Sequence, residues 1–439
     1  MGNYIGCHWI ENITRSIMVF ITLLNQPWAL MFIFIAFSAS FVYLIFYRPV
    51  TVYRDLTGIK SDLRFNVASS ETMVRQRFLK RARQENENPS KSIPMYANGW
   101  TFLCHSDEVR TNCVKYIEAL GEDFAVFRKS NGKVHVVNAY CPHLGANMGV
   151  GGIVKDDCLQ CPFHGWRFDG DTGKCKSIPY TDKVPRLAKV QAWKCCEVNH
   201  MIFVWYHAEG EEPTYEIPPV DEIMSGKYSL AGKCEYLING SIGDLSHGSA
   251  DLEHFQAIHA PPWLRDRTFA PDKSFSLRHS LRLIVKMEEW TVHHTEPHRA
   301  LSKTCLHLNI LDRITVLSFR ASVKWINAGH FETEINISTL KMNAHMKLLT
   351  CITPVGPAIQ RVVTVHYCHP LLVPLNRLVF RLFLCTFEED VKIYNYKKIH
   401  PNVIITKEED VYVKWKRWHS QFFSKNSPQL KIQTELSSW

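Results

Sequence analysis

The amino-acid sequence predicts an α+β protein: an N-terminal transmembrane helix, a small all-β domain, and a larger α+β domain of antiparallel sheet and helices. Three observations support this prediction. No charged residue occurs between Ser16 and Tyr47. Short segments of alternating polarity surround the turn sequence Ser130-Asn131-Gly132, which is typical of a β-hairpin. Strand-like segments near the C-terminus then precede a long segment of helical periodicity at residues 375–396.

These patterns divide the chain into four regions. Residues 1–48 are predicted to form a lumenal N-terminus and transmembrane anchor, and residues 49–95 a basic juxtamembrane linker. Residues 96–208 form the small β domain. An acidic, proline-containing segment at 209–221 marks the boundary, and the larger domain occupies residues 209–439.

The composition excludes several classes of protein. A chain of 439 residues with 46% apolar residues buries a sizeable core and is not disordered in bulk. The net charge of +9 lies partly just after the apolar run, which favours an anionic membrane surface over nucleic acid as its partner. Fourteen cysteines are too sparse for a disulfide scaffold and fit a reducing compartment.

The apolar run has the length of a membrane span. Residues 28–47 are twenty consecutive, mostly apolar positions, and about 20 helical residues cross a hydrocarbon core of about 30 Å. A buried core helix is the alternative. Basic residues follow the run more densely than they precede it, which places the C-terminal part in the cytosol. We therefore expect a single-pass protein of the endoplasmic reticulum. The basic residues are Arg48, Arg54, Lys60 and Arg64.

The predicted elements follow in order. Residues 70–85 form a basic helix, which lies either on the membrane surface or over the next domain. A polar linker at 85–94 follows. Predicted strands of the small domain include 124–127, 133–138, 189–193 and 201–206, after an opening strand at Asn98-Gly99-Trp100. Predicted strands of the large domain are 281–287, 304–310, 332–340, 347–352 and 361–366, and its helices are 375–396 and 407–422.

The small domain contains a mirrored pair of ligand motifs. Cys141 and His143 form a Cys-x-His pair, and Cys161 and His164 form a Cys-x-x-His pair seventeen residues later. Two thiolates and two imidazoles on paired loops suit a [2Fe–2S] cluster that has Cys on one iron and His on the other. A structural zinc site is the alternative, but its two histidines normally lie together on a helix. The motifs resemble those of the Rieske family, including Pro-Phe-His-Gly-Trp at 162–166.

A second metal site follows about ninety residues later. Asp251, His254 and His259 form an Asp-x-x-His-x4-His segment. Two imidazoles and a carboxylate make the facial triad that binds mononuclear non-haem Fe(II) and leaves positions open for dioxygen. Because the histidines are five residues apart, a regular helix would not aim both at one iron, so we expect a local distortion. A satisfied core histidine is the alternative for His254.

The third ligand should be a distant carboxylate. The segment Phe387-Glu388-Glu389-Asp390-Val391 resembles the Glu-x-Asp-Val of Rieske oxygenases, and Asp390 matches the ligand position. By the same resemblance, Asp251 joins the mononuclear site to the cluster of a neighbouring subunit as an electron-transfer bridge. A carboxylate three residues before a ligand His equally fits a group that only orients that His.

The order of anchor, cluster domain and facial-triad domain resembles the Neverland-type cholesterol 7-desaturases of animals. This resemblance implies that cholesterol or a related sterol is desaturated at C7–C8 to 7-dehydrocholesterol with O2, in steroid hormone (ecdysteroid-type) biosynthesis. It also implies a homotrimer. Residues 255–258 and 247–249 depart from the family pattern. Hydroxylation of another steroid therefore stays open as an alternative.

The electrons must come from another protein. No Gly-x-Gly-x-x-Gly follows a predicted strand in this sequence, so we expect a separate NAD(P)H-dependent reductase to reduce the cluster. A membrane-bound Rieske electron carrier without catalysis is the alternative from another class of protein. The iron content discriminates the two, because a carrier would bind two irons per chain and an oxygenase three.

Overall fold

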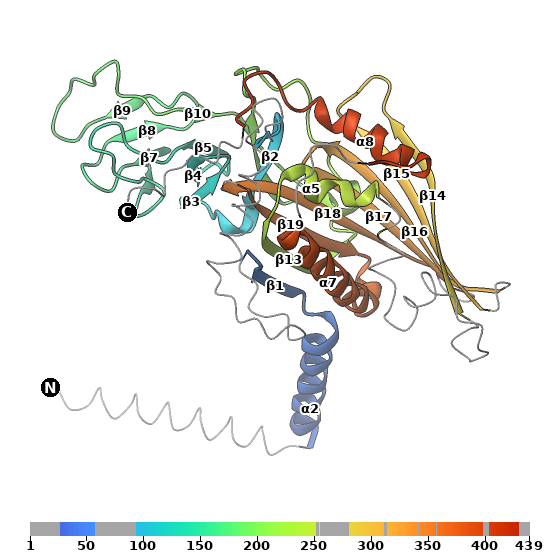
Figure 1. The fold of residues 1–439 in the computed structure, drawn as a ribbon. Coiled ribbons are helices and arrows are strands. Elements are labelled where there is room, and N and C mark those ends of the chain that lie inside the picture. The colour runs from blue at the N-terminus through green and yellow to red at the C-terminus, as the bar shows by residue number, and fades with distance from the viewer. Residues whose placement is uncertain are drawn as a thin grey trace.

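The computed structural model describes residues 27–57, 94–251, 254, 281–310, 314–339, 343–356, 358–397 and 404–429. Three sequence predictions lie outside these residues: the basic helix at 70–85, most of the linker at 85–94, and the ligand His259. In the described part, the small β domain lies at one end of a large sheet, and the N-terminal helix α2 projects from below the sheet (Figure 1).

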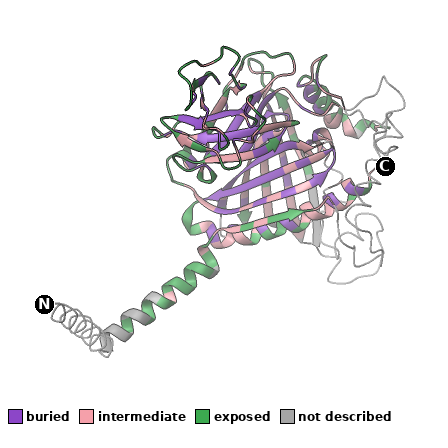
Figure 2. Cartoon of the chain, turned by 90° about the vertical axis from the view of Figure 1, so that its left-hand side faces the viewer, coloured by how far each residue is buried: buried purple, intermediate pink, exposed green. Residues whose placement is uncertain are grey.

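The N-terminal helix is present where the sequence predicts it. α2 (Pro27–Val42) continues into a π-helical turn, η1 (Tyr43–Tyr47), and neither contains a charged residue. Apolar side chains of α2 are exposed, with Phe34 and Phe37 each 71% accessible. The helix extends away from the body of the protein (Figure 2). Within the described residues, one helix, Pro370–Tyr396, has the length and hydropathy of a membrane span. α2 has 16 residues before η1 begins, so it does not reach that length by itself.

The chain that follows the anchor joins the large sheet. β1 (Val50–Asp55) pairs in parallel with β13 (Ser229–Asn239) and forms an edge of the sheet. The pairing continues past the strand, because the Leu56 amide donates to the Leu237 carbonyl at 2.8 Å. The sequence predicted only a linker here, so this strand was missed. The N-terminal helix is therefore connected directly to the large domain.

The small domain is all-β, as predicted. The expected hairpin at Ser130-Asn131-Gly132 joins β4 (Glu122–Arg128) to β5 (Val134–Asn138) in antiparallel register. The first ligand motif precedes a separate four-stranded sheet, β6-β7-β8-β9, and the second connects its strands β7 and β8. Its strands are Ile153–Lys155, Cys158–Gln160, Arg167–Asp169 and Cys175–Ser177. The other strands are β2 (Gly99–His105), β3 (Val114–Ala119), β10 (Ala192–Trp193), β11 (Cys195–Val198) and β12 (Met201–Tyr206).

The large sheet has eight strands in the order β1-β13-β19-β18-β17-β16-β15-β14, antiparallel except at β1. Each predicted strand of the second half is present, although longer than predicted, and β13 and β16 were missed. The bounds are β14 (Leu281–Val292), β15 (Ala300–Ile310), β16 (Ile314–Asn327), β17 (His330–Thr339), β18 (Asn343–Gly356) and β19 (Ile359–Cys368). The helical elements are α4 (Asp221–Met224), α5 (Ile242–Ser246), η4 (His247–Ser249), η7 (Pro370–Leu372), α7 (Val373–Tyr396), η8 (Lys407–Glu409) and α8 (Asp410–Ser420), with η3 (Ser106–Glu108) in the small domain.

The two faces of the large sheet bury different cores. On one face, α5, α7 and α8 pack on the strands (Figure 1), and Phe380 and Trp418 belong to one hydrophobic cluster with the sheet residue Trp325. The rings of Trp418 and Trp325 lie 5.5 Å apart between centroids. On the other face, side chains of β2 and β12 form a second cluster with Leu349 and Val363. Because strand side chains alternate between faces, Val362 joins the first core and Val363 the second. The sheet is therefore covered by helices on one side and by the β domain on the other.

Hydrogen bonds fix the two domains against each other. The Asn327 side chain donates to the Trp100 carbonyl at 2.9 Å, and the Thr353 hydroxyl donates to the Phe102 carbonyl at 2.8 Å. Asn327 and Thr353 are themselves buried. Unpaired buried polar groups are unfavourable, so these bonds favour one relative position of the domains.

Candidate metal centres

The two cluster loops have the same backbone conformation. In the first, the Cys141 amide donates to Ala146 and the Gly145 amide donates back to Cys141, each at 2.9 Å. The second repeats this pattern: Cys161 donates to Trp166 at 2.8 Å, and Gly165 donates to Cys161 at 3.1 Å. Gly145 and Gly165 both adopt positive φ angles of 74° and 72°, which glycine tolerates best. Two equivalent loops therefore present one thiol and one imidazole each.

The loops bring the four predicted cluster ligands together. The rings of His143 and His164 lie 4.7 Å apart between centroids, and His143 stacks on Trp166 at 4.6 Å. Both Cys141 and Cys161 are 2% exposed. The Nδ1 atom of His143 is buried and has no hydrogen-bond partner. A buried nitrogen without a partner at this position fits a metal ligand.

The burial of Cys141 is also consistent with a bound cation. Burial, the largest effect, raises the pKa of the Cys141 thiol to about 11. Ionisation of this thiol would therefore be favoured by a neighbouring positive charge, which bound iron would supply. Two sulfur and two nitrogen donors fit a [2Fe–2S] centre, and their separation into two mirrored loops does not fit a helical zinc finger.

The mononuclear site begins at the end of a short helix. Ser241 caps α5, with its hydroxyl accepting from the Asp244 amide and Asp244 accepting from the Ser241 amide. The Asp251 amide donates to the His247 carbonyl at 3.1 Å, which turns the chain toward His254. The Asp251 carboxylate then lies 3.7 Å from Nδ1 of His254 and accepts from the His254 amide at 3.4 Å. Since Nδ1 faces Asp251, Nε2 is the nitrogen that would bind a metal.

Asp390 approaches this histidine from α7. Burial opposes the charge of His254, but Asp251 and Asp390 together raise the pKa of His254 above its usual value. Burial likewise opposes ionisation of Asp251, and the bond from His254 nevertheless lowers the pKa of that carboxyl. The described residues contain no group of three or more His, Cys, Asp or Glu side chains that would hold one ion. Two of the three predicted ligands, His254 and Asp390, lie on described elements.

The two glutamates before Asp390 have other partners. Glu388 accepts from Arg54 at 2.7 Å and from the Tyr236 hydroxyl at 2.9 Å. Glu389 accepts from Lys392 at 2.8 Å. Glu388 therefore links α7 to the strand that follows the anchor, and Glu389 pairs with a neighbour on its own helix. In both cases the carboxylate is engaged by a basic side chain.

Sequence reasoning gave no role to His247 and Tyr394, which line the same site. His247 is packed near Tyr394, with ring centroids 6.2 Å apart, and burial lowers its pKa. A Cβ atom added at Gly248 would lie 3.6 Å from the Tyr394 hydroxyl and 3.9 Å from Cε1 of His254, so both side chains adjoin this glycine. Burial, followed by Asp390, Asp244 and Asp251, raises the pKa of Tyr394. In the sequence, His247 was marked only by the departure of residues 247–249 from the family pattern, and Tyr394 only as an aromatic residue shortly after Asp390.

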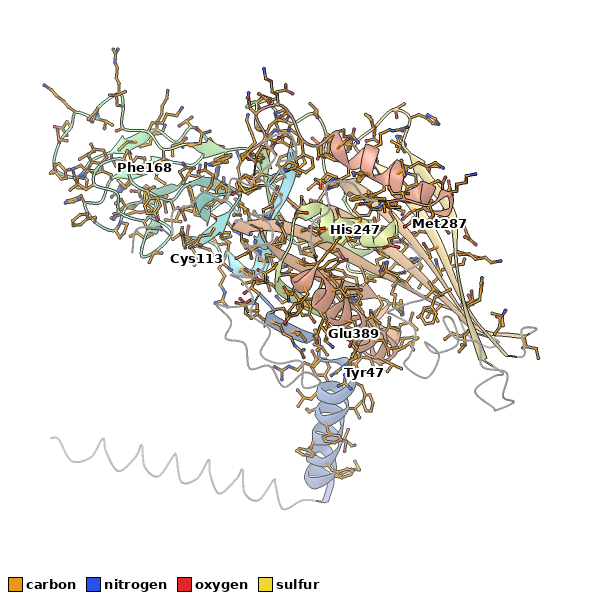
Figure 3. The ribbon with its side chains drawn as sticks, viewed as in Figure 1. Tyr47, Cys113, Phe168, His247, Met287 and Glu389 are labelled. Carbon is orange, nitrogen blue, oxygen red and sulfur yellow. The ribbon has the colours of Figure 1, made fainter. Side chains whose placement is uncertain are left out.

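The two candidate centres lie far apart within one chain. Phe168, which packs under the cluster loops with Cys141 and Cys161, belongs to the far end of the small domain. His247 and Glu389, which neighbour the candidate mononuclear site, lie over the large domain and are well separated from Phe168 (Figure 3). Large apolar side chains next to the cluster histidines are exposed, with Leu144 65% and Phe163 61% accessible. These side chains therefore form an exposed apolar surface beside the cluster loops.

Comparisons with known proteins agree with this architecture. Residues 99–191 match the model of the Rieske [2Fe-2S] domain, and residues 204–423 match the 3-ketosteroid 9alpha-hydroxylase C-terminal domain. Cholesterol 7-desaturase nvd 1 of Ciona intestinalis is 38% identical over 349 residues, which are 78% of this chain and 72% of that protein. Cholesterol 7-desaturase nvd of Drosophila melanogaster is 33% identical over 413 residues, 90% of this chain and 91% of that protein. Dicamba monooxygenase bound to dicamba superposes with a TM-score of 0.58 at 16% identity, over 75% of this chain and 98% of that chain, which shows the fold.

Proposed function

Because the chain belongs to the cholesterol 7-desaturase family of Rieske oxygenases, we propose that it desaturates cholesterol at C7–C8 to 7-dehydrocholesterol. The reaction consumes O2, two electrons and two protons, removes two hydrogen atoms from the sterol, and releases two water molecules. Identity of 38% to a cholesterol 7-desaturase over 78% of the chain is the observation that carries this proposal. The proposed desaturation would belong to steroid hormone synthesis of the ecdysteroid type.

The small domain would receive the electrons. Cys141, His143, Cys161 and His164 would hold a Rieske cluster, which transfers single electrons. The exposed Leu144 and Phe163 beside the histidines offer an apolar contact for a reductase that oxidises NAD(P)H. We propose a separate reductase, since the sequence has no dinucleotide fingerprint of its own.

The large domain would perform the oxidation. His254, His259 and Asp390 would hold a mononuclear Fe(II), which supplies the oxidant for an unactivated C–H bond. Asp251 holds the His254 ring by its Nδ1 contact and so fixes which ring nitrogen faces the metal position. Tyr394 and His247, which are both partly buried, would limit the access of water to this side of the site.

Electrons would pass between chains. Phe168, which belongs to one hydrophobic cluster with Cys141 and Cys161, is well separated from His247 and Glu389 of the same chain (Figure 3), so transfer within one chain would have to span that separation. A homotrimer that places one cluster beside a neighbour's Asp251 would shorten this path. Asp251 is 35% exposed at its side chain, so a neighbouring imidazole could donate to it while it also contacts His254.

The anchor would place the enzyme in a membrane. The uncharged α2 and η1, with apolar side chains exposed along their length, fit a single crossing of the bilayer. Arg48 and Arg54 follow the crossing and favour a cytosolic catalytic domain, in the endoplasmic reticulum. The scattered free cysteines are consistent with a domain in the reducing cytosol.

Conversion of labelled cholesterol tests the proposal. Cells without endogenous 7-desaturation would express the chain and receive cholesterol deuterated at C7 and C8. We expect 7-dehydrocholesterol that has lost two deuterium atoms, detected by mass spectrometry, and none from cells expressing Asp390→Ala. A hydroxylated sterol without the C7–C8 double bond, which would keep at least one of these deuterium atoms, would instead support steroid hydroxylation. The match to a 3-ketosteroid 9alpha-hydroxylase domain favours that reaction as the second candidate. No product and two irons per chain would identify an electron carrier.

A further inference from the structure

The N-terminal half of α7, with the preceding turn η7, has an apolar face that the domain leaves uncovered. Leu371, Leu378 and Leu382 are 75%, 58% and 55% exposed. Their spacing of seven and four residues aligns them along one side of the helix. The opposite side buries Phe380 and Leu384 in the core below the sheet. Single exposed leucines are ordinary on a protein surface, but a contiguous row on one helix marks an interaction surface.

This leucine face adjoins the N-terminal anchor. Tyr47, the last residue of η1, packs against the same hydrophobic cluster as Leu372, Leu375 and Val379 at the beginning of α7. η1 and α7 are in contact, and Figure 3 shows Tyr47 where the anchor meets the domain beside α7. The exposed apolar surface of α2 therefore continues onto the leucine face of α7.

The charges near this face fit a lipid headgroup layer. Between Pro370 and Thr386 the chain has two basic residues, Arg377 and Arg381, and no acidic one. Arg381 is exposed, and so is Arg48 at the end of the anchor. The acidic residues of α7 begin only at Glu388. An amphipathic helix with an apolar face and flanking arginines is the pattern of a helix that lies in the membrane interface.

We propose that the leucine face of α7 is a second membrane contact, which rests on the cytosolic surface of the bilayer that α2 crosses. This inference depends on the proposed anchoring by α2. Leu382 precedes Asp390 by eight residues, or about 12 Å along the helix at 1.5 Å per residue. Contact with lipid at Leu382 therefore brings the predicted iron ligand close to the bilayer. A sterol would then reach the site from the membrane without exposing its apolar rings to water.

Fluorescence quenching in vesicles tests this contact on the full-length protein. Cys7, Cys113 and Cys385 are first replaced by Ser, since the last two are the exposed thiols among the described cysteines. An environment-sensitive probe is then attached at Leu378→Cys or Leu382→Cys. The protein is reconstituted in vesicles of phosphatidylcholine and phosphatidylserine in which some acyl chains are brominated near the headgroup.

We expect the lipid quencher to reduce the fluorescence at both α7 positions, and aqueous iodide to have little effect. Leu187→Cys, at a position 92% exposed on the small domain, is the matched control and should respond only to iodide. Phe37→Cys on α2 reports anchoring independently. Quenching at Phe37→Cys but only by iodide at Leu378→Cys would overturn the second contact and leave the anchor intact. Shielding of Leu378→Cys from both quenchers would show that another copy of the chain covers this face, which also overturns the inference.

A kinetic measurement separates lipid contact from a structural role. The double variant Leu378→Ser/Leu382→Ser changes exposed side chains only, so its Rieske-type paramagnetic resonance signal and its anchoring should be unchanged. With cholesterol supplied in vesicles, we expect KM to rise several-fold and kcat to stay constant. With cholesterol supplied in detergent micelles, the variant and the wild type should have equal KM. A fall in kcat with unchanged KM, or an equal rise of KM in micelles, would contradict the proposal.

Discussion

Asp244 connects the two elements that position the mononuclear ligands, and its removal should loosen that site selectively. Its carboxylate closes the capping box of α5 with Ser241 at 2.7 Å and pairs with Lys397 at 3.0 Å, just beyond the end of α7. α5 leads to His254, and α7 carries Asp390. The Asp244–Lys397 pair therefore holds the two ends of the site together.

The cost of Asp244→Ala follows from these contacts. Loss of the cap costs about 1 kcal/mol. The side chains of Asp244 and Lys397 are 16% and 36% exposed, so the ion pair lies between the surface range of about 0–1 kcal/mol and the buried range of about 3–5 kcal/mol. A total of about 2–3 kcal/mol should lower the unfolding temperature of the large domain by roughly 4–12 °C.

Tryptophan fluorescence is a suitable assay, because Trp415 lies 6.0 Å from His247 and reports this region. We expect Asp244→Ala to lose mononuclear iron and retain the cluster signal. Glu389→Gln is the matched control: its pair with Lys392 is exposed and is worth at most about 0.5 kcal/mol. Equal unfolding temperatures and equal iron content in Asp244→Ala and the wild type would refute the reasoning.

The pH dependence provides a second check on Asp244. Burial would raise its pKa, but Lys397 and Ser241 hold the pKa of this carboxyl below its ordinary value of 3.8. A depressed folded pKa means that the ionised carboxylate stabilises the protein above the unfolded pKa. The stability advantage of the wild type over Asp244→Asn should therefore be complete near neutral pH and decline as the pH falls below about 4. An advantage that grows on acidification would contradict the assignment.

Four further predictions concern the two metal centres and the topology. His143→Ala or Cys161→Ala should abolish the visible absorption and the Rieske-type paramagnetic resonance signal together with activity. A variant that keeps the signal would contradict the assignment of the cluster. Asp390→Ala should keep that signal while product formation stops, because one of only three protein ligands is lost; wild-type turnover would mean that another carboxylate binds the iron. Co-expressed His164→Ala and His254→Ala chains should recover part of the activity in mixed oligomers, whereas no recovery in verified mixed oligomers would exclude transfer between chains. Protease added to intact microsomes should digest a C-terminal tag, and a protected tag would reverse the proposed orientation.

The sequence was sufficient for the features that depend on local chemistry. The Cys-x-His and Cys-x-x-His motifs predicted two equivalent loops, because a tight turn around Gly145 or Gly165 needs only nearby residues. The hairpin at Ser130-Asn131-Gly132 and the long helix near 375–396 were predicted for the same reason, since turn chemistry and helical periodicity are local. The sequence predicted that these elements exist, but it did not predict the residues at which the strands begin and end.

The tertiary structure decided what depends on distant partners. Nothing in the segment Val50–Asp55 predicts a parallel partner, because its register is set by β13, which lies far along the chain. The sequence did not predict the partners of Glu388 and Tyr394 either. Glu388 accepts hydrogen bonds from Arg54 and Tyr236, and Tyr394 lies beside Gly248 and His254. Sequence patterns therefore predicted the candidate metal ligands from their residue types and local spacings. Which neighbouring groups hold them, and which face of α7 stays exposed, follows only from the packing of segments remote in the chain, because those contacts exist only after folding.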